Sequence, residues 1–240
     1  MKLTYDGCSQ KGLVRDRNED AYLMRSAGHA ALFLVADGIG GRDHGEQVSA
    51  MLRDAYDTWF QRRILLPGTN LDFPAAVGEM KAVLLNQNRE VIHRFGTMSA
   101  GSTLVLLFLL GNSYLYLSSG DSRIYQKRGL SVKQITVDDV YENWIHQKAE
   151  LNPSDRGKLV AAIGIHPTPQ FSLGTGTLRV GDRFFLCSDG VYRYVAPRML
   201  RRKILLGGTP KNLVHDLSKT VERNGAGDNY SMVYVQVHTV

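Results

Sequence analysis

Residues 31–41 read ALFLVADGIGG, in which six apolar residues lead into Asp37 and then into a glycine-rich segment. A short run of β-branched and aromatic residues bounded by Asp and Gly is typical of a buried β-strand. A carboxylate next to such a strand is costly to bury unless a cation or a hydrogen-bonding partner compensates its charge. This stretch therefore predicts a core strand that delivers a candidate site residue.

The same arrangement recurs at three further places in the chain. Residues 114–117 lead through Ser-Ser-Gly to Asp121, and residues 184–187 lead through one serine to Asp189. In the fourth case the order is reversed, because Asp228 precedes an apolar run. One Asp-Gly pair after a strand is usually a turn. Four strands that each place an aspartate at one end favour a shared site instead.

Helical patterns lie between the predicted strands. Apolar residues recur at helical spacing in residues 45–63 and 73–95. Two later helices are predicted to begin at prolines, over residues 197–206 and 210–221. A glycine turn at residues 111–113 predicts a hairpin between two strands. Strands and paired helices in this order predict an α+β protein in which helices cover antiparallel sheets.

Composition and charge limit the function classes. With 240 residues, 43% of them hydrophobic, the chain can bury one large core. The basic residues behind the formal charge of +6 are scattered and form no aromatic-interleaved stripe, so nucleic acid is not an expected partner. Two cysteines without CxxC spacing favour a reducing, cytoplasmic location. The longest hydrophobic run, residues 103–110, is far shorter than the roughly 20 residues of a membrane helix, so no membrane insertion is expected.

The acidic residues require a counter-charge. The segment RDRNED adds Glu19 and Asp20 to the four strand-end aspartates, which makes six acids. If these acids converge in a partly desolvated cleft, their mutual repulsion requires protons or cations. All candidate ligands are oxygen donors, and no His or Cys lies at a zinc-like spacing. Hard ions such as Mg²⁺ or Mn²⁺ are therefore expected.

Two such ions suit phosphoryl transfer especially well. They make hydroxide available near neutral pH and neutralise charge on a phosphoryl oxygen. Arg15 lies five residues before Asp20, and a guanidinium binds phosphate oxygens through two parallel hydrogen bonds. These residue types favour hydrolysis of a phosphate ester.

Six fragments of the chain resemble the metal-dependent (type 2C) serine/threonine protein phosphatases. They are GLVRDRNEDA, VADGIGG, GSTLVLL, GDSRIY, LCSDGV and GDNYSMVYV, which occur in the family's order over residues 12–237. The resemblance implies a four-layer αββα fold, a central β-sandwich of two antiparallel sheets flanked by helix pairs, with the metal centre in a cleft at one end. It also implies a single catalytic domain over residues 1–240, with a flap excursion around residues 138–164.

The resemblance assigns the metal ligands residue by residue. Asp37 would bridge two Mn²⁺ or Mg²⁺ ions, and the carbonyl of Gly38 would be a further ligand. The other implied metal ligands are Glu19, Asp20, Asp121, Asp189 and Asp228. Among them, Asp121 matches the position at which many bacterial members hold a third, weaker ion.

The remaining matched residues have other implied roles. Arg15 would bind the substrate phosphate and counts with Asp37 as a catalytic residue. Thr103 and Asn229 match positions that support the metal ligands without binding the metal themselves. Together these residues imply an intact dinuclear site.

The implied function is a protein serine/threonine phosphatase that hydrolyses phosphoserine or phosphothreonine by direct attack of a metal-bridging water. The implied partner is a phosphorylated protein, either a cognate Ser/Thr kinase or its target, as in bacterial kinase–phosphatase pairs that include regulators of type VI secretion. We expect a monomer. The alternative is a catalytically silent phosphopeptide-binding pseudo-phosphatase, which would typically have lost a metal carboxylate or the arginine. As substrates, a small phosphoester and the phosphoserine of an anti-sigma-factor antagonist stay open.

Three positions depart from the family's pattern. Ile39 stands where relatives have histidine or methionine, so no side-chain general acid is expected there. Residues 136–139 lack the histidine of the family's TxDH, and residues 159–164 lack the arginine of its LTRAxG. A basic contact for the phosphopeptide is therefore expected to be lost or to have moved.

Overall fold

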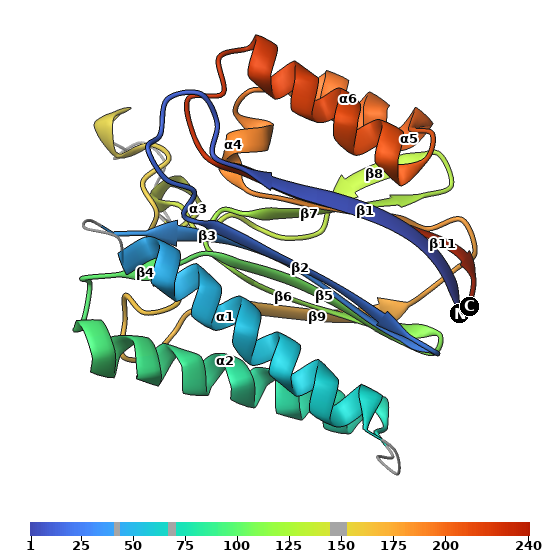
Figure 1. Ribbon diagram of the computed structural model, residues 1–240, viewed down its shortest axis with the longest axis horizontal. Coiled ribbons are helices and arrows are strands. Elements are labelled where there is room, and N and C mark those ends of the chain that lie inside the picture. The colour runs from blue at the N-terminus through green and yellow to red at the C-terminus, as the bar shows by residue number, and fades with distance from the viewer. Residues whose placement is uncertain (41–43, 67–70, 145–152) are drawn as a thin grey trace.

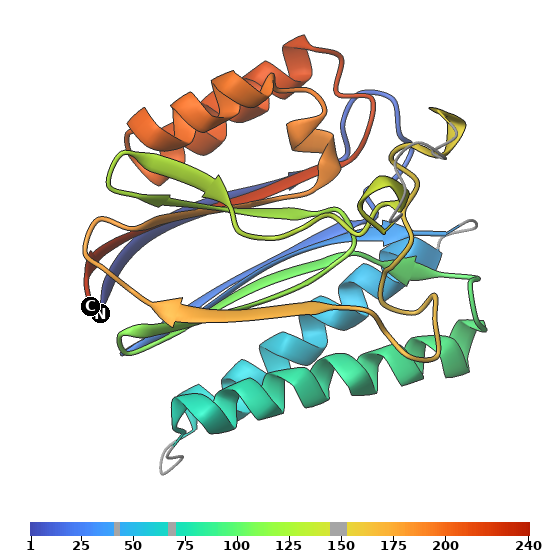
Figure 2. The ribbon, with the colours of Figure 1, turned by 180° about the vertical axis from the view of Figure 1, so that it is seen from behind.

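The protein is a four-layer αββα sandwich in the computed structural model, which describes residues 1–40, 44–66, 71–144 and 153–240. Figures 1 and 2 show two β-sheets stacked face to face, with a pair of helices on the outer side of each sheet. All the strand pairs within the two sheets are antiparallel. The predicted α+β fold with a central sandwich is confirmed.

The first sheet has five strands in the order β1-β11-β10-β7-β8. Their bounds are β1 Lys2–Gln10, β7 Arg123–Arg128, β8 Ser131–Gln134, β10 Arg183–Cys187 and β11 Tyr230–Thr239. The two predicted strands of this sheet are β10 and β11, which lie at its centre. The edge strand β1 was not predicted, because none of its residues is fully buried and its sequence lacks an apolar run.

The second sheet has the order β2-β3-β5-β6-β9, with the short β4 paired to β3. Its bounds are β2 Asp20–Ala27, β3 Ala30–Ile39, β4 Gly101–Ser102, β5 Leu104–Leu110, β6 Ser113–Ser119 and β9 Ser172–Thr177. β5 and β6 form the predicted hairpin. β3 continues to Ile39, so Asp37 lies within the strand instead of just beyond it.

The unbroken apolar run of β3 reflects burial on both of its faces. Leu32 and Leu34 pack toward helices α1 (His44–Phe60) and α2 (Phe73–Phe95), whereas Phe33 and Val35 join the core between the two sheets. Successive side chains of a strand point to opposite faces, so only a strand covered twice shows no polar alternation. The stretch that delivers Asp37 is therefore a central and rigid part of the sandwich.

The helices follow the predicted ranges closely. α2 has the predicted bounds, and α5 (Pro197–Leu206) and α6 (Pro210–Arg223) begin at the predicted prolines. α1 ends at Phe60 and continues as a π-helical turn, Gln61–Leu65. The apolar sides of α5 and α6 pack on the outer face of the first sheet, as Leu200, Ile204 and Leu217 show.

The predicted flap excursion is described in part. It contains the short helix α3 (Tyr141–Trp144) and a 3₁₀ turn, Pro153–Asp155, and its residues 145–152 lie outside the described residues. The amide of Asp139 donates to the carbonyl of Gly120 at 2.9 Å, and Val140 pairs with Leu159. The first flank is thus attached to the segment that carries Asp121, and the two flanks are attached to each other.

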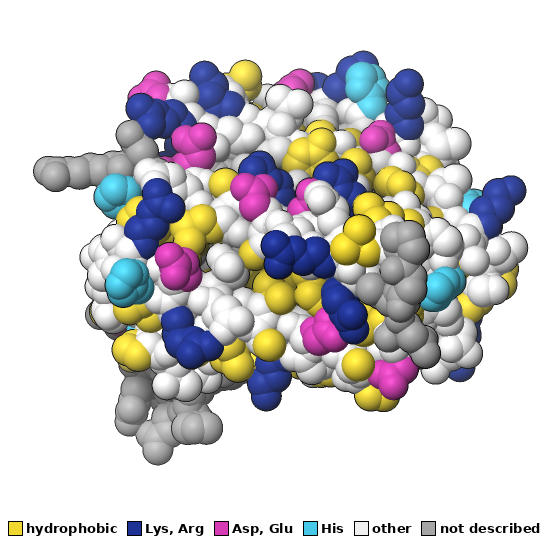
Figure 3. All heavy atoms as spheres, turned by 60° about the horizontal axis from the view of Figure 1, so that its bottom comes forward, with side chains coloured by type: hydrophobic (Ala, Val, Ile, Leu, Met, Phe, Trp, Pro, Cys, Tyr) yellow, Lys and Arg dark blue, Asp and Glu magenta, His cyan; other side chains and the backbone are white. Residues whose placement is uncertain are grey.

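The outer face formed by α1 and α2 carries charges of both signs. Figure 3 shows Lys and Arg side chains interspersed with Asp and Glu side chains on this face. Arg63 of the π-helical turn pairs with Glu79 of α2 at 2.9 Å, for example. Within the described ranges, no helix combines the length and apolar character needed to cross a membrane.

Candidate metal and phosphate site

A cavity of about 350 Å³ at one end of the sandwich contains nine of the ten residues predicted for the site. These nine are Arg15, Glu19, Asp37, Gly38, Thr103, Asp121, Asp189, Asp228 and Asn229. The tenth, Asp20, is buried and lies opposite Asp37 on the neighbouring strand. The fold therefore brings together segments as distant as Arg15 and Asp228, which are 213 residues apart and in contact.

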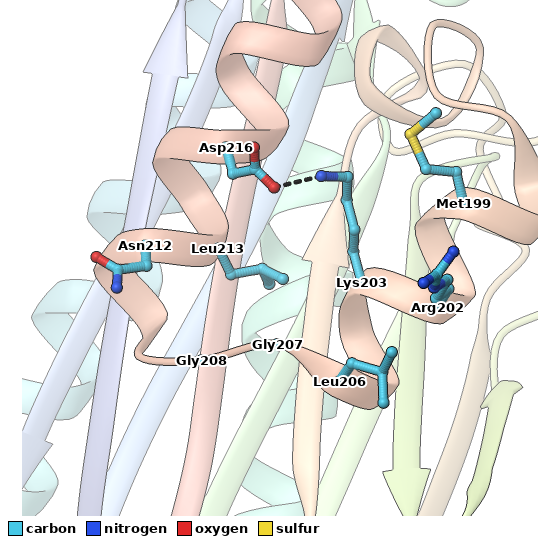
Figure 4. A pocket seen from close by; sticks show the side chains of 9 residues that line it. All are labelled: Met199, Arg202, Lys203, Leu206, Gly207, Gly208, Asn212, Leu213 and Asp216. Carbon is cyan, nitrogen blue, oxygen red and sulfur yellow. Dashed lines mark hydrogen bonds and ion pairs between the residues drawn. The ribbon is translucent and has the colours of Figure 1, made fainter.

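A second, larger hollow of about 490 Å³ lies between α5 and α6 (Figure 4). Its walls include the apolar side chains of Met199, Leu206 and Leu213, and Lys203 pairs with Asp216 within it. None of the ten predicted site residues, all of which are described, lines this hollow. The smaller cavity is therefore the one that brings the predicted site residues together.

Two carboxylates of the site meet across the β2–β3 pair. Asp20 lies directly opposite Asp37, and Ser188 Oγ donates to Asp20 Oδ2 at 2.8 Å. Asp20 Oδ1 is buried and has no hydrogen-bond partner in the described part of the chain. Because buried polar atoms normally have partners, this oxygen fits a bound cation or a proton.

Burial changes the protonation of the site. It raises the pKa of Asp20 to about 7 and that of Asp189 to about 6. Burial, followed by repulsion from Asp20, also raises the pKa of Asp37 well above its usual range. The metal-free site therefore retains protons near neutral pH, and a divalent cation would displace them.

The metal-free protein should lose stability as the pH rises from about 4 to about 7. In this window the folded acids bind more protons than the unfolded ones, whose pKa is about 3.9, so the free energy of unfolding falls with pH. Thermal unfolding in EDTA at several pH values measures the slope. The slope should flatten in Asp20→Asn, and stabilisation by Mn²⁺ should grow with pH. An EDTA profile that rises over this window contradicts the prediction.

Arg15 forms an ion pair with Asp228, one of the predicted metal ligands. Its Nε and Nη2 contact the two oxygens of Asp228 at 2.8 and 3.0 Å, and its side chain is 55% exposed. The hydrogen bond to Asp228 raises the pKa of the guanidinium, which stays charged. This two-point pairing with a carboxylate has the geometry that a phosphate would also accept.

Thr103 and Asn229 support the backbone around the carboxylates. Thr103 Oγ1 accepts from the amide of Asp37 at 3.0 Å, and the amide of Thr103 donates to the carbonyl of Asp37 at 2.8 Å. Asn229 accepts from the amide of Glu19 at 2.9 Å and donates to the carbonyls of Lys11 and Arg17. Thr103 thus holds β3, and Asn229 holds the loop that carries Arg15.

Protein backbone crowds Gly38. A Cβ at this position would lie 2.3 Å from the carbonyl oxygen of Gly45 and 2.7 Å from that of Glu19. Glycine is therefore required by the close approach of protein backbone at the start of α1, whatever its carbonyl binds.

Two residues of the site were missed in the sequence. Tyr192 donates to Asp121 Oδ2 at 2.9 Å, and Arg193 Nη2 lies 3.0 Å from Asp189 Oδ2 and 3.4 Å from Asp121 Oδ2. Tyr192 is the last residue of the short helix α4 (Asp189–Tyr192), and Arg193 follows it as the C-cap. The available signal was the i,i+4 spacing of Asp189 and Arg193, but it depends on residues after SDG being helical.

The oxygen atoms of the predicted ligands suit hard divalent cations. In this structure, however, three of the carboxylates are paired with arginines. Among the described residues, no three Asp, Glu, His or Cys side chains already form a compact ligand group. Asp228 is paired with Arg15, and Asp189 and Asp121 with Arg193. Oxygen donors, raised pKa values and the unpartnered Asp20 Oδ1 all favour cations of the Mn²⁺ or Mg²⁺ type.

The similarity to known proteins covers nearly the whole chain. The family model described as protein phosphatase 2C matches residues 8–224. The chain belongs to this family. Protein phosphatase PhpP of Streptococcus pneumoniae is 29% identical, with 95% of this chain and 94% of PhpP aligned. Serine/threonine protein phosphatase PstP of Mycobacterium tuberculosis is also 29% identical, over 99% of this chain, which spans 45% of PstP's length.

Solved structures of such phosphatases have the same fold. PppA, described as a key regulatory component of T6SS in Pseudomonas aeruginosa, has a TM-score of 0.81 at 32% identity, with 98% of each chain covered. The catalytic domain of PstP, in complex with two manganese ions, has a TM-score of 0.80 at 28% identity, with 99% of each chain covered. The fold and family implied by the six sequence fragments are confirmed.

Proposed function

We propose that this chain is a metal-dependent phosphoprotein phosphatase that hydrolyses phosphoserine and phosphothreonine. The observation that carries the proposal is the convergence of carboxylates from both sheets with Arg15 in one cavity. The residues that would hold two Mn²⁺ or Mg²⁺ ions are Glu19, Asp20, Asp37, Gly38 through its carbonyl, Asp189 and Asp228. Two such ions supply a nucleophilic water near neutral pH and neutralise phosphoryl charge.

The protein's own residues orient the substrate. Arg15 would exchange its contact with Asp228 for the phosphate oxygens if a cation held that carboxylate, because both partners accept the same two-point pairing. Ile39 lines the cavity but has no ionisable group, so the proton for the leaving serine or threonine oxygen does not come from this side chain. Asn229 keeps Arg15's loop close to Asp228.

The substrate is a phosphorylated protein, either a cognate Ser/Thr kinase or a target of that kinase. The similarity to PppA, a regulatory component of type VI secretion, supports a role as the reversing member of a regulatory pair. Residues 1–240 act as one monomeric catalytic domain. Deleting the gene should raise the phosphorylation of at least one serine or threonine protein, and an unchanged phosphoproteome contradicts this partner.

Hydrolysis of a phosphothreonine peptide should require Mn²⁺ or Mg²⁺ and should stop on addition of EDTA. Phosphate release is measured while each ion is titrated, with a phosphoserine peptide and p-nitrophenyl phosphate compared at equal concentration. A higher kcat/KM for the peptides supports a protein substrate, and a preference for the small ester contradicts it. A folded, metal-loaded protein that binds phosphopeptide without turnover is instead a pseudo-phosphatase.

A further inference from the structure

Two hydrogen-bond donors contact the carboxylate of Asp121, and other residues hold both donors in place. Tyr192 OH and Arg193 Nη2 both reach its Oδ2, at 2.9 and 3.4 Å. The guanidinium of Arg123 stacks 3.4 Å from the centre of the Tyr192 ring and is itself paired with Asp138 at 2.6 Å. The tyrosine that contacts Asp121 is therefore fixed by a stacked, ion-paired arginine.

Arg193 is held beside the same carboxylate by backbone geometry. Its amide donates to the carbonyl of Asp189 at 2.9 Å, which closes one helical turn, and its guanidinium returns to the Asp189 carboxylate at 3.0 Å. The guanidinium thus contacts both Asp189 Oδ2 and Asp121 Oδ2. A cation that binds Asp121 Oδ2 would have to displace this guanidinium.

The charge balance of the cavity also disfavours a third divalent ion. The five carboxylates that line it and Asp20 carry a formal charge of −6 when ionised, and two guanidiniums together with two divalent ions balance that charge. Before a phosphate binds, a third divalent ion would leave an excess of positive charge in the partly desolvated site, which is unfavourable.

We infer that Arg193 is the permanent cation at Asp121 and takes the place of a third metal ion, so that the centre of this chain holds two ions only. The inference rests on the proposed two-ion phosphatase and identifies a positioning residue for it. Arg193 orients Asp121 through the contact that a third ion would otherwise make, so Asp121 needs no third ion to hold its position.

The test is the number of Mn²⁺ ions bound by the full, metal-free chain. Equilibrium dialysis and titration calorimetry are carried to about 5 mM free Mn²⁺, which covers weak sites with dissociation constants on the order of 1 mM. Wild-type protein should saturate at two ions. Arg193→Asp, which supplies a third carboxylate beside Asp121 and Asp189, should saturate at three ions, and the matched Arg193→Lys should stay at two.

Three results overturn the inference, and they differ in what else they affect. Wild-type protein that binds three ions, one of them lost in Asp121→Asn, shows that Arg193 does not exclude the ion, and the two-ion phosphatase survives. Saturation of folded Arg193→Asp at two ions shows that the guanidinium was not what kept the ion out. Wild-type protein that binds fewer than two ions overturns the proposed function as well. Circular dichroism of each variant confirms that the comparison is between folded proteins.

Discussion

Asp37→Asn should lower the kcat/KM for Mn²⁺-dependent hydrolysis of a phosphothreonine peptide by at least about a thousandfold, or roughly 4 kcal/mol of transition-state stabilisation. The amide is neutral, so it cannot bridge two cations as a carboxylate does. Asp37 lies on a strand buried on both faces, opposite Asp20 and fastened to Thr103, so no other carboxylate can move into its place. Steady-state kinetics over a Mn²⁺ titration measures the loss.

The control for this substitution is Asp57→Asn, which makes the same chemical change outside the cavity. Asp57 lies on α1, pairs with Arg25 at 2.7 Å and does not line the cavity. The substitution therefore removes an ion pair but no candidate metal ligand. Its activity should equal that of the wild type. Retention of Mn²⁺-dependent turnover by Asp37→Asn would rule out the bridging role.

Asp37→Asn should also change stability in a direction that separates its role from simple damage. Without metal, a neutral amide beside Asp20 removes repulsion and burial cost, so the melting temperature should rise by about 2–4 °C for each kcal/mol gained. The stabilisation by Mn²⁺ should nearly disappear. A metal-free variant that melts below the wild type contradicts this account of the site.

Gly190→Ala should destabilise the protein by roughly 3 kcal/mol or more, at the upper end of what overpacking usually costs. A Cβ at position 190 would lie 1.9 Å from the carbonyl oxygen of Asn229, which is backbone and cannot rotate away. To relieve the clash, α4 must separate from the Asp228–Asn229 segment. Urea unfolding should show the loss of stability, and Mn²⁺ affinity should fall because Asp189 and Asp228 move apart.

Gly78→Ala provides the matched control for this glycine. Gly78 lies within α2, and a Cβ there meets no atom within 4 Å. The same substitution should therefore stabilise the protein by about 0.5–1 kcal/mol, because alanine favours the helix and restricts the unfolded chain. Equal effects at the two positions would show that the contact with Asn229 is not what requires glycine at position 190.

The fold could be predicted best for the elements whose burial determines their residue types. The strands covered on both faces, such as β3 and β5, are continuous apolar runs, and α2 and α5 show helical periodicity with prolines or caps at their starts. The peripheral strands were missed because they are partly exposed. In β9, glycines replace the expected apolar residues and make room for the rings of Tyr114 and Tyr116.

The candidate site was predicted from acidic residues in recurring positions and from the six family fragments. Arg193 of the cavity wall and Tyr192, which donates to Asp121, belong to neither group and were not predicted. Ile39 shows the opposite case, since its departure from the family's pattern was visible in the sequence, and the structure places it in the cavity wall.

By itself, the sequence determined which side chains this protein has for cation and phosphate chemistry and which segments form its doubly covered core, because both follow from residue type and short-range periodicity. Only the tertiary structure decided which of those charges meet. Arg193 and Asp121 are 72 residues apart, and Arg15 and Asp228 are 213 residues apart. Their contacts depend on how two sheets stack and where α4 begins, and pairing between distant charges leaves no local signal in the chain.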